Sequence, residues 1–235
     1  MKIYRRYKQQ ILSSQSGFTI IESLVAIIVA GILMTAIAPT IVLSVATRVQ
    51  AKRVELATDA SKSYIDGVRT STIAPPPLPP NLSEAQLKAY DFSRYNAPQQ
   101  GTLTCTPNNY CTSPQPNLYC VDGDADGSCS NTSSRDMIIQ AFRYNKNSIE
   151  PEDGFSLGVR VYRADAFNRG ITLQALKDTG AKKQSTFTGG TGLRSVQTPL
   201  IESTTEISTG ANFADFCDRL KPATSPSVSN PQSRC

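Results

Sequence analysis

The sequence predicts an α+β protein, in which a long N-terminal helix, apolar in its first half, packs against a small antiparallel β-sheet head with disulfide-rich loops. The helix is predicted by a charge-free apolar run at residues 23–46 and by the segment after it, where apolar residues recur every three to four positions. The sheet is predicted by strand-like runs that begin only at residue 137. The 235 residues leave room for one membrane element and roughly one soluble domain.

The apolar run is long enough to span a membrane. At about 1.5 Å per residue, residues 23–46 form a helix of about 36 Å, and the hydrocarbon core of a bilayer is about 30 Å thick. All six cysteines follow the run, and four basic residues precede it: Lys2, Arg5, Arg6 and Lys8. The positive-inside rule therefore predicts a cytoplasmic N-terminus and an extracytoplasmic C-terminal domain.

Glu22 places a single carboxylate at the start of this run, where a charge in hydrocarbon costs about 2.5–3.5 kcal/mol. A plain single-pass anchor gives no reason for that charge. A secretory signal peptide is a second interpretation, since Ala36 and Ala38 form a small-x-small cleavage site, but Pro39 would then follow the scissile bond. Each alternative leaves one of these features unexplained.

The stretch "GFTIIE" resembles the processing site of type IV prepilins and pseudopilins. The resemblance implies that a prepilin peptidase cuts after Gly17, that Phe18 becomes the N-methylated N-terminus, and that Glu22 is the glutamate of the motif. It also implies that Gly31 and Pro39 are the glycine and proline at which pilin stems bend or melt during assembly; close helix packing is the alternative for Gly31. The implied partners are other pilin or pseudopilin subunits, the prepilin peptidase, an inner-membrane assembly platform and membrane lipid.

Electrostatics independently favours a role for Glu22 in assembly. Cleavage before Phe18 creates an α-amine with a reference pKa of about 7.7–8.0, which is cationic at neutral pH. Glu22 lies one turn along the helix, where the helix dipole favours an anion, and it can pair with Phe18 of its own chain or of a neighbour. A charge that is costly alone and paired on assembly sets the axial register of packed helices.

The helix is expected to continue as an amphipathic stem to about residue 68, with an apolar stripe of Val49, Leu56, Ala60, Tyr64 and Val68. The stretch "VATRVQ…RVELA…YIDGVR" also resembles the pseudopilins of hormogonium polysaccharide secretion in filamentous cyanobacteria. That resemblance implies a minor subunit of a secretion pseudopilus that supports polysaccharide export.

Proline content predicts the domain boundaries. "APPPLPP" at residues 74–80 is expected to end the helix and to form a stiff spacer, because consecutive prolines donate no backbone hydrogen bonds. Ser83 and Gln86 have the spacing of a capping box for a short helix beyond it. The predicted parts are a leader peptide at 1–17, a transmembrane and amphipathic stem helix at 18–73, a proline-rich linker at 74–82 and an extracytoplasmic globular head at 83–235.

The cysteines favour disulfides over a metal site. No two have C-x2-C spacing and the chain has no histidine, so zinc is a poor fit. Residues 98–135, rich in Cys, Pro, Asn, Ser and Gly, are expected to form a disulfide-pinned loop region. Many pairings are open, and a Cys217–Cys235 bridge resembles the C-terminal disulfide loop of many pilins. The candidates are Cys105, Cys111, Cys120, Cys129, Cys217 and Cys235.

A calcium loop is suggested inside this region. Asp122, Asp124 and Asp126 alternate and precede Gly127, which is the opening of a D-x-D-x-D-G loop. A curled loop can turn alternate side chains toward one centre, and Ca²⁺ takes about six to eight oxygen ligands. Ser128 is a further candidate ligand through its backbone carbonyl. The bidentate glutamate of an EF-hand is missing, so an ordinary EF-hand sensor is excluded; a solvated Asp-Gly turn is the alternative to calcium.

Strand signals follow the loop region. "MIIQAFRY" at 137–144 is rich in β-forming residues, and "FSLGVRVY" at 155–162 alternates strictly between apolar residues and Ser156, Gly158 and Arg160. The two runs are expected to pair antiparallel. A third strand near 195–207 would complete a meander whose apolar face packs on the stem helix.

Composition argues against nucleic-acid binding and catalysis. Most of the net charge of +5 lies in the leader, and the chain has no histidine, no G-x-S-x-G elbow and no phosphate loop. The sequence therefore predicts a non-enzymatic structural subunit of the cytoplasmic membrane, with its head in the periplasm or on an extracellular pilus. A minor pilin for adhesion, motility or DNA uptake and a membrane-anchored extracellular binding module are the alternatives. The loops at 98–135 and 179–192 are the candidate partner surfaces.

Overall fold

The computed structural model describes residues 17–178, 181, 196–208, 210, 213 and 217. The chain divides into two compact units, Met1–Val45 and Ala46–Cys235. The long helix α1, Ile20–Arg69, contributes to both units. We describe each unit by itself.

The first unit is the apolar half of α1. Every residue from Ile20 to Val45 is exposed in the single chain, although the segment is strongly apolar. Within the described residues, α1 is the helix whose length and composition suffice to cross a membrane. Such a surface is stable only in lipid or against other helices, because water solvates apolar side chains poorly.

The helix continues through Gly31 and Pro39. Pro39 has no backbone N–H, so it cannot donate to the carbonyl four residues earlier, that of Thr35. Hydroxyl groups on both sides bond back to the main chain: the Oγ1 of Thr35 donates to the carbonyl of Ile32 at 2.8 Å, and the Oγ1 of Thr40 to that of Ile37 at 2.7 Å. The apolar half of α1 therefore contains a locally weakened turn.

The second half of α1 packs against the sheet of the second unit, as the sequence predicts. Ala60, Tyr64 and Val68 of the predicted stripe are buried and Leu56 is partly buried. Val49 is exposed, so the prediction for this residue was wrong. The buried stripe also includes Ala57 and Ser61, and near the apolar half Gln50 is buried in place of its neighbour Val49.

The sheet is a five-stranded antiparallel meander in the order β1-β2-β3-β4-β5. Strand β3, Met137–Tyr144, has the predicted bounds, and β4, Phe155–Arg163, is one residue longer than predicted. They form the predicted antiparallel pair, and β5, Ile201–Ile207, returns beside β4. The β-rich composition of these runs and the turn residues between them account for the pairing.

The remaining strands correct the prediction of an irregular loop at 98–135. Strand β1, Asn109–Tyr110, pairs with β2, Leu118–Val121, and β2 pairs with β3. Both strands are too short to establish a period of two, and three of the four residues of β2 are buried. Without a polar face, such a run gives no alternation in the sequence.

Both faces of the sheet are covered. One face forms a core with α1, and the opposite face forms a second core against the segments around Leu103 and Ala164–Leu173. The sequence placed Arg160 on a polar face, but its side chain is 1% exposed. Its guanidinium donates to the carbonyl of Tyr95 at 2.9 Å, pairs with Glu202 at 3.0 Å and lies 4.8 Å from the Phe142 ring centre. The buried charge is therefore paired and hydrogen-bonded, as burial requires.

The helix ends at Arg69, several residues before the first proline of the proline-rich segment. Ser71 has a φ of 59°, and the N–H groups of Thr72 and Ile73 donate to the carbonyl of Gly67 at 2.9 and 3.0 Å. This left-handed turn terminates the helix, so the prediction that the prolines end it was wrong. The predicted capping box of Ser83 and Gln86 is confirmed at the start of α2, Glu84–Lys88. Short 3-10 helices complete the unit at Phe92–Arg94, Pro151–Asp153 and Ala164–Asn168.

Candidate functional site

The predicted processing site lies just before the start of the long helix. Gly17 and Phe18 precede α1, and the Phe18 side chain is 81% exposed. Thr19 caps the helix: its Oγ1 accepts a hydrogen bond from the N–H of Glu22 at 3.3 Å, and its carbonyl accepts one from the N–H of Ser23 at 3.1 Å. The Gly17–Phe18 peptide is therefore outside the helical hydrogen-bond ladder, which is the condition for a protease to bind it in extended form.

Glu22 occupies the first turn of α1. Its side chain is exposed, and within the described residues its carboxylate has no hydrogen bond or ion pair. The N-terminal end of the helix dipole stabilises a carboxylate there by about 0.3–1 kcal/mol, less than the cost of a charge in hydrocarbon. In hydrocarbon, a cationic partner would have to offset the difference between this stabilisation and the cost of the charge. A free amine on Phe18 would lie four residues before Glu22, close to the first turn of the helix.

Gly31 and Pro39 lie farther along the exposed apolar half of α1. A Cβ added at Gly31 would meet no described atom within 4 Å, so no contact in the described part of the chain requires glycine there. Helix propensity disfavours glycine by about 1 kcal/mol relative to alanine. The open space beside Gly31 permits close approach by another helix, and the weakened turn at Pro39 permits local bending.

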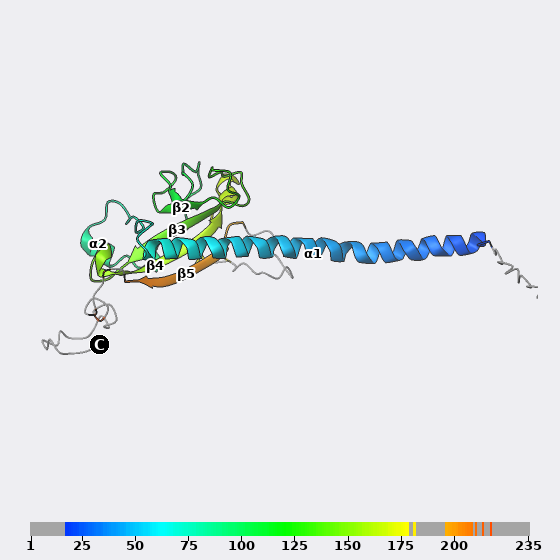
Figure 1. The fold of residues 1–235 in the computed structure, drawn as a ribbon, viewed down its shortest axis with the longest axis horizontal. Coiled ribbons are helices and arrows are strands. Elements are labelled where there is room, and N and C mark those ends of the chain that lie inside the picture. Colours follow the sequence, from blue (N-terminus) through cyan, green and yellow to red (C-terminus); the bar gives the residue numbers. More distant parts are fainter. Residues whose placement is uncertain are drawn as a thin grey trace, which may run out of the picture. The chain divides into compact units, whose positions relative to one another are not determined.

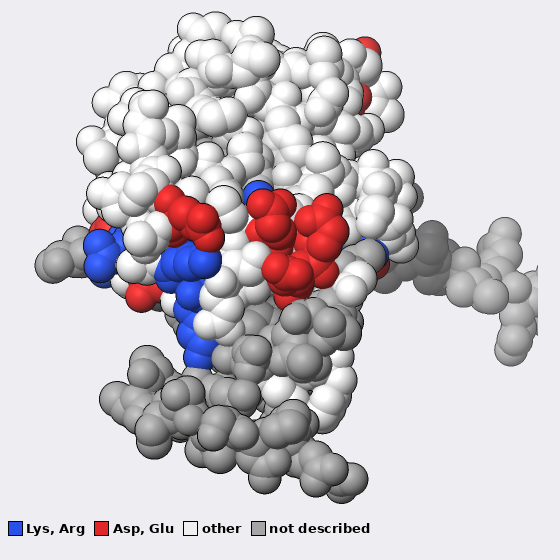
Figure 2. Space-filling model, turned by 90° about the vertical axis from the view of Figure 1, so that its left-hand side faces the viewer, with Lys and Arg blue, Asp and Glu red and all other residues white. Residues whose placement is uncertain are grey.

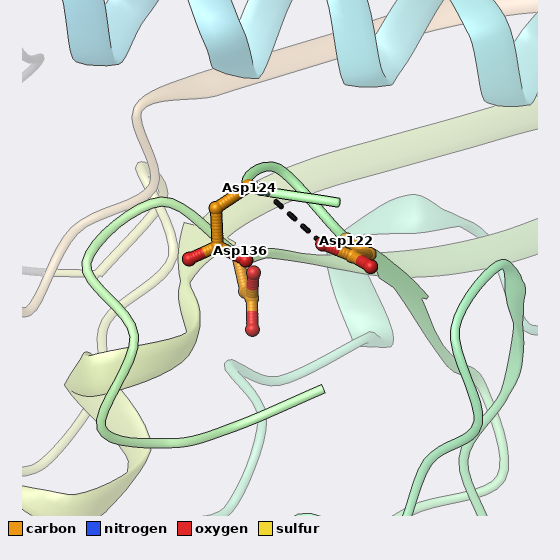
Figure 3. Close-up of side chains that lie close together, drawn as sticks. All are labelled: Asp122, Asp124 and Asp136. Atoms are coloured by element: carbon orange, nitrogen blue, oxygen red, sulfur yellow. Dashed lines mark hydrogen bonds between the residues drawn. The ribbon is translucent and has the colours of Figure 1, made fainter. Parts of the chain in front are cut away.

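Three aspartates lie close together at the predicted calcium loop. The carboxylates of Asp122, Asp124 and Asp136 lie within 4.8 Å of one another (Figure 3). The register of the sheet explains this: Val121 of β2 pairs with Met137 of β3, so the residues just beyond the two strand ends, Asp122 and Asp136, are brought together. Asp136 was not predicted, because it is 14 positions from Asp122 and only strand pairing reveals it.

Each aspartate of the loop already accepts hydrogen bonds. Asp122 accepts from the N–H groups of Ala125 at 2.6 Å and Gly127 at 2.9 Å, and the dashed line in Figure 3 marks its bond with the N–H of Asp124. Asp126 accepts from the N–H and hydroxyl of Ser128 and is not part of the group. The predicted set of Asp122, Asp124, Asp126 and Ser128 is therefore not assembled as a set, and calcium binding stays a prediction.

Asp136 is fully buried at the base of this loop. Its carboxylate accepts hydrogen bonds from the N–H groups of Ser130 at 2.9 Å and Gly123 at 3.3 Å. Burial raises the pKa of Asp136, against the lowering effect of these two donors. A cation bound beside it would remove that penalty on the charged form.

Two disulfides fix the loops around this group. Cys105 is bonded to Cys111, and Cys120 of β2 is bonded to Cys129, so the second bridge closes the loop that carries the aspartates. The prediction of disulfides is confirmed for these four cysteines. Cys217 is buried, but Cys235 lies outside the described residues, and so does the predicted bridge between them. Most of the predicted partner loop at 179–192 also lies outside them.

Charge is unevenly distributed over the second unit. Figure 2 shows acidic side chains in a compact group beside a strip of basic ones, and the upper part of the same face carries almost no charge. On the described part of this face, charges of both signs lie close together rather than forming one broad basic surface. Because neighbouring charges of opposite sign cancel at a distance, such a surface attracts a partner protein weakly from afar but pairs with it specifically at close range.

Comparison with known proteins identifies one motif. Residues 12–38 match the family model described as the prokaryotic N-terminal methylation motif. A search of curated proteins and a search of solved structures gave no match. The matched residues include the predicted cleavage and methylation site and the apolar start of α1. With this motif, a long N-terminal apolar helix and an α+β architecture, the chain is similar to type IV pilin-like subunits, which are membrane-anchored or located in a pilus.

Proposed function

We propose that this type IV pilin-like subunit is a minor pseudopilin of a type IV pilus-like or type II secretion-like machine that supports polysaccharide export. The leader at 1–17 is removed after Gly17, and Phe18 is N-methylated. The stem at 18–73 then holds the chain in the inner membrane, while the linker at 74–82 and the head at 83–235 lie outside the cytoplasm. The chain acts as a structural part of the machine and not as an enzyme.

The match of residues 12–38 to the N-terminal methylation motif carries this proposal. It is supported by the position of the Gly17–Phe18 bond, which lies outside regular secondary structure and just before a helix that begins at Ile20. The exposed apolar surface of α1 as far as Val45 also supports it. In a membrane this surface contacts lipid, and in a filament it would be buried against the stems of other subunits.

Glu22 is the proposed assembly residue. Before assembly its carboxylate is a cost in the apolar environment, and after cleavage the methylated amine of a Phe18 offsets that cost. Pairing with Phe18 of the neighbouring subunit is satisfied at only one axial position of the two helices. The ion pair therefore fixes the axial register of the two helices, while apolar contact along α1 supplies most of the buried surface between them.

The test separates processing from assembly. Glu22→Gln keeps the shape of the side chain and removes its charge, so we expect full cleavage after Gly17 but strongly reduced recovery with sheared or membrane-extracted filaments. Glu22→Asp retains the charge and is expected to recover part of the assembly. Glu55→Gln is the matched control, because Glu55 lies on the same helix, is exposed and, among the described residues, pairs with Lys52 alone, at 3.0 Å.

Unchanged assembly of the Glu22→Gln protein would contradict the proposed role of this residue and would favour a plain membrane anchor. Loss of assembly in the Glu55→Gln control would show that charge changes anywhere on α1 disturb the filament. Cleavage is measured by mass and assembly by co-fractionation with the other subunits.

Polysaccharide export is tested in the native host. Deletion of the gene is expected to reduce exported polysaccharide, measured by carbohydrate staining of the washed medium, and reintroduction of the full chain is expected to restore it. Loss of adhesion, motility or DNA uptake with normal polysaccharide export would instead assign the chain to a minor pilin of such a pilus.

A further inference from the structure

A cavity of about 280 Å³ lies between the proline-rich segment and the second face of the sheet. One wall consists of residues 77–80, and the loop at 115–117 lines another part. Tyr90, Tyr95 and Asn96 complete the lining together with Gln140 of β3. The proline-rich segment is thus part of a folded pocket rather than a free spacer.

The walls of the cavity are held in place by packing and hydrogen bonds. The ring of Tyr90 lies edge-on to that of Tyr95 with centres 4.8 Å apart, and Tyr95 stacks on Phe142 at 4.5 Å. The side-chain amide of Gln140 donates to the carbonyl of Asn96 at 2.9 Å and accepts from buried Arg160 at 3.2 Å. Because these contacts already hold the side chains in place, little conformational entropy of the protein is lost when a ligand binds.

The polar groups of the cavity are amides. Asn96, Gln115, Asn117 and Gln140 line it, and none of the lining residues carries a charge. Among the described residues the side-chain amide of Asn117 has no hydrogen-bond partner, whereas the unpaired Oε1 of Gln115 is enclosed by protein atoms and has almost no accessible surface. A ligand in the cavity can therefore donate to and accept from the amide of Asn117, but it cannot reach the oxygen of Gln115.

These observations restrict the class of ligand. A charged group would be buried without a counter-charge, and a purely apolar one would remove water from the amide of Asn117 without replacing its hydrogen bonds. The ligand must be neutral, must carry several hydrogen-bond donors and acceptors, and must present apolar surface to proline and tyrosine. A sugar ring has this combination, with hydroxyl groups at its edge for the two-sided amides and C–H faces for Tyr90 and the prolines.

We propose that this cavity binds a neutral sugar residue of a glycan chain, with Asn117 as its hydrogen-bonding residue and Tyr90 as its aromatic wall. A second hollow of about 430 Å³ shares Asn96 with the first and is lined further by Gln99, Gln100 and Asp178, and neighbouring residues of the same glycan would continue there. The inference rests on the cavity and does not depend on filament assembly or on the exported substrate.

The test uses the full chain in a detergent without a sugar headgroup. The chain contains 9 tyrosines and no tryptophan, so binding near Tyr90 changes the intrinsic tyrosine fluorescence. The probes are linear neutral pentasaccharides of glucose, mannose and galactose, each titrated to about 10 mM, a range that covers weak binding. A pentasaccharide of uronic acids and a proline-rich peptide serve as charged and peptide probes.

We expect saturable binding of at least one neutral pentasaccharide, weakened about tenfold by Asn117→Ala, which corresponds to one or two hydrogen bonds. Asn147→Ala is the control, because Asn147 is exposed and lies outside the cavity.

Four results would overturn the inference. These are the absence of binding by all three neutral probes, equal binding by the Asn117→Ala and Asn147→Ala proteins, tighter binding of the uronic acids, and binding of the peptide alone. The last result would assign the cavity to a peptide of a partner subunit. None of the four would affect the proposed role of Glu22, since the assay does not require assembly.

Discussion

Substitution of Tyr64 tests whether the second half of α1 belongs to the core of the second unit. Tyr64 is 1% exposed, and its hydroxyl lies 2.7 Å from that of Tyr110. Tyr110 donates its own proton to the carbonyl of Ala74 at 2.9 Å, so Tyr64 is the donor in the pair. The Tyr64 ring also lies 5.0 Å from the ring of Tyr119 on β2.

These contacts give the expected magnitudes. Tyr64→Phe removes one buried hydrogen bond and leaves the packing intact, so the free energy of unfolding should fall by about 1 kcal/mol. Tyr64→Ala also empties a large part of the core and should cost about 3–5 kcal/mol. For a unit of this size, 1 kcal/mol lowers the melting temperature by about 2–4 °C, so we expect shifts of about 3 °C and about 10 °C.

The assay is thermal unfolding of the full chain in detergent micelles, followed by near-ultraviolet circular dichroism of the tyrosines. Tyr144→Phe is the matched control, because no partner of the Tyr144 hydroxyl is found among the described residues and its removal should be neutral. Equal shifts for Tyr64→Phe and Tyr144→Phe, or a shift below about 2 °C for Tyr64→Ala, would refute the packing of α1 on the sheet.

Three further predictions concern the strands, the aspartate loop and alkaline pH. Gly158→Ala would place a Cβ 2.1 Å from the ring of Phe142, which its neighbours hold in place, so unfolding in urea should show a loss of about 1–3 kcal/mol. If the group of Asp122, Asp124 and Asp136 binds calcium with a dissociation constant of about 1 mM, about 10 mM Ca²⁺ should raise the free energy of unfolding by about 1.4 kcal/mol. Asp136→Asn should abolish this stabilisation and Asp126→Asn should not. Loss of the stabilisation in Asp126→Asn alone would favour the loop predicted from the sequence. Burial raises the pKa of Tyr162 far above its usual value near 10, so the folded chain favours the protonated phenol. The contribution of Tyr162 to the free energy of unfolding is therefore complete below about pH 10 and falls by about 1.4 kcal/mol per pH unit above it. Tyr162→Phe should reduce this loss of stability at alkaline pH.

The parts of the fold that the sequence predicted are those with a sustained period. The strict alternation from Phe155 and the β-rich run from Met137 predicted β4 and β3, and the spacing of Ala60, Tyr64 and Val68 predicted the buried stripe of α1. Local chemistry was equally informative at the start of α2, where the capping box lies within four residues.

The parts that were missed depend on distant residues. Strand β2 is too short for a period and is defined by its pairing with β3, and the same pairing brings Asp136 to the aspartate loop. Arg160 looked like an exposed residue of an alternating strand, because only the folded chain shows Tyr95 and Glu202 placed to pair with it. Likewise, the cavity beside residues 77–80 joins segments that the sequence treats as linker, loop and strand.

The central claim is that the chain is cut between Gly17 and Phe18 and is methylated on the new N-terminus. The most direct test is the intact mass and the N-terminal peptide sequence of the protein purified from native membranes. We predict a chain that begins with N-methylated Phe18. A chain that begins at Met1, or at Pro39 after a signal-peptidase cut, would contradict the claim and leave an anchored or secreted disulfide-containing domain.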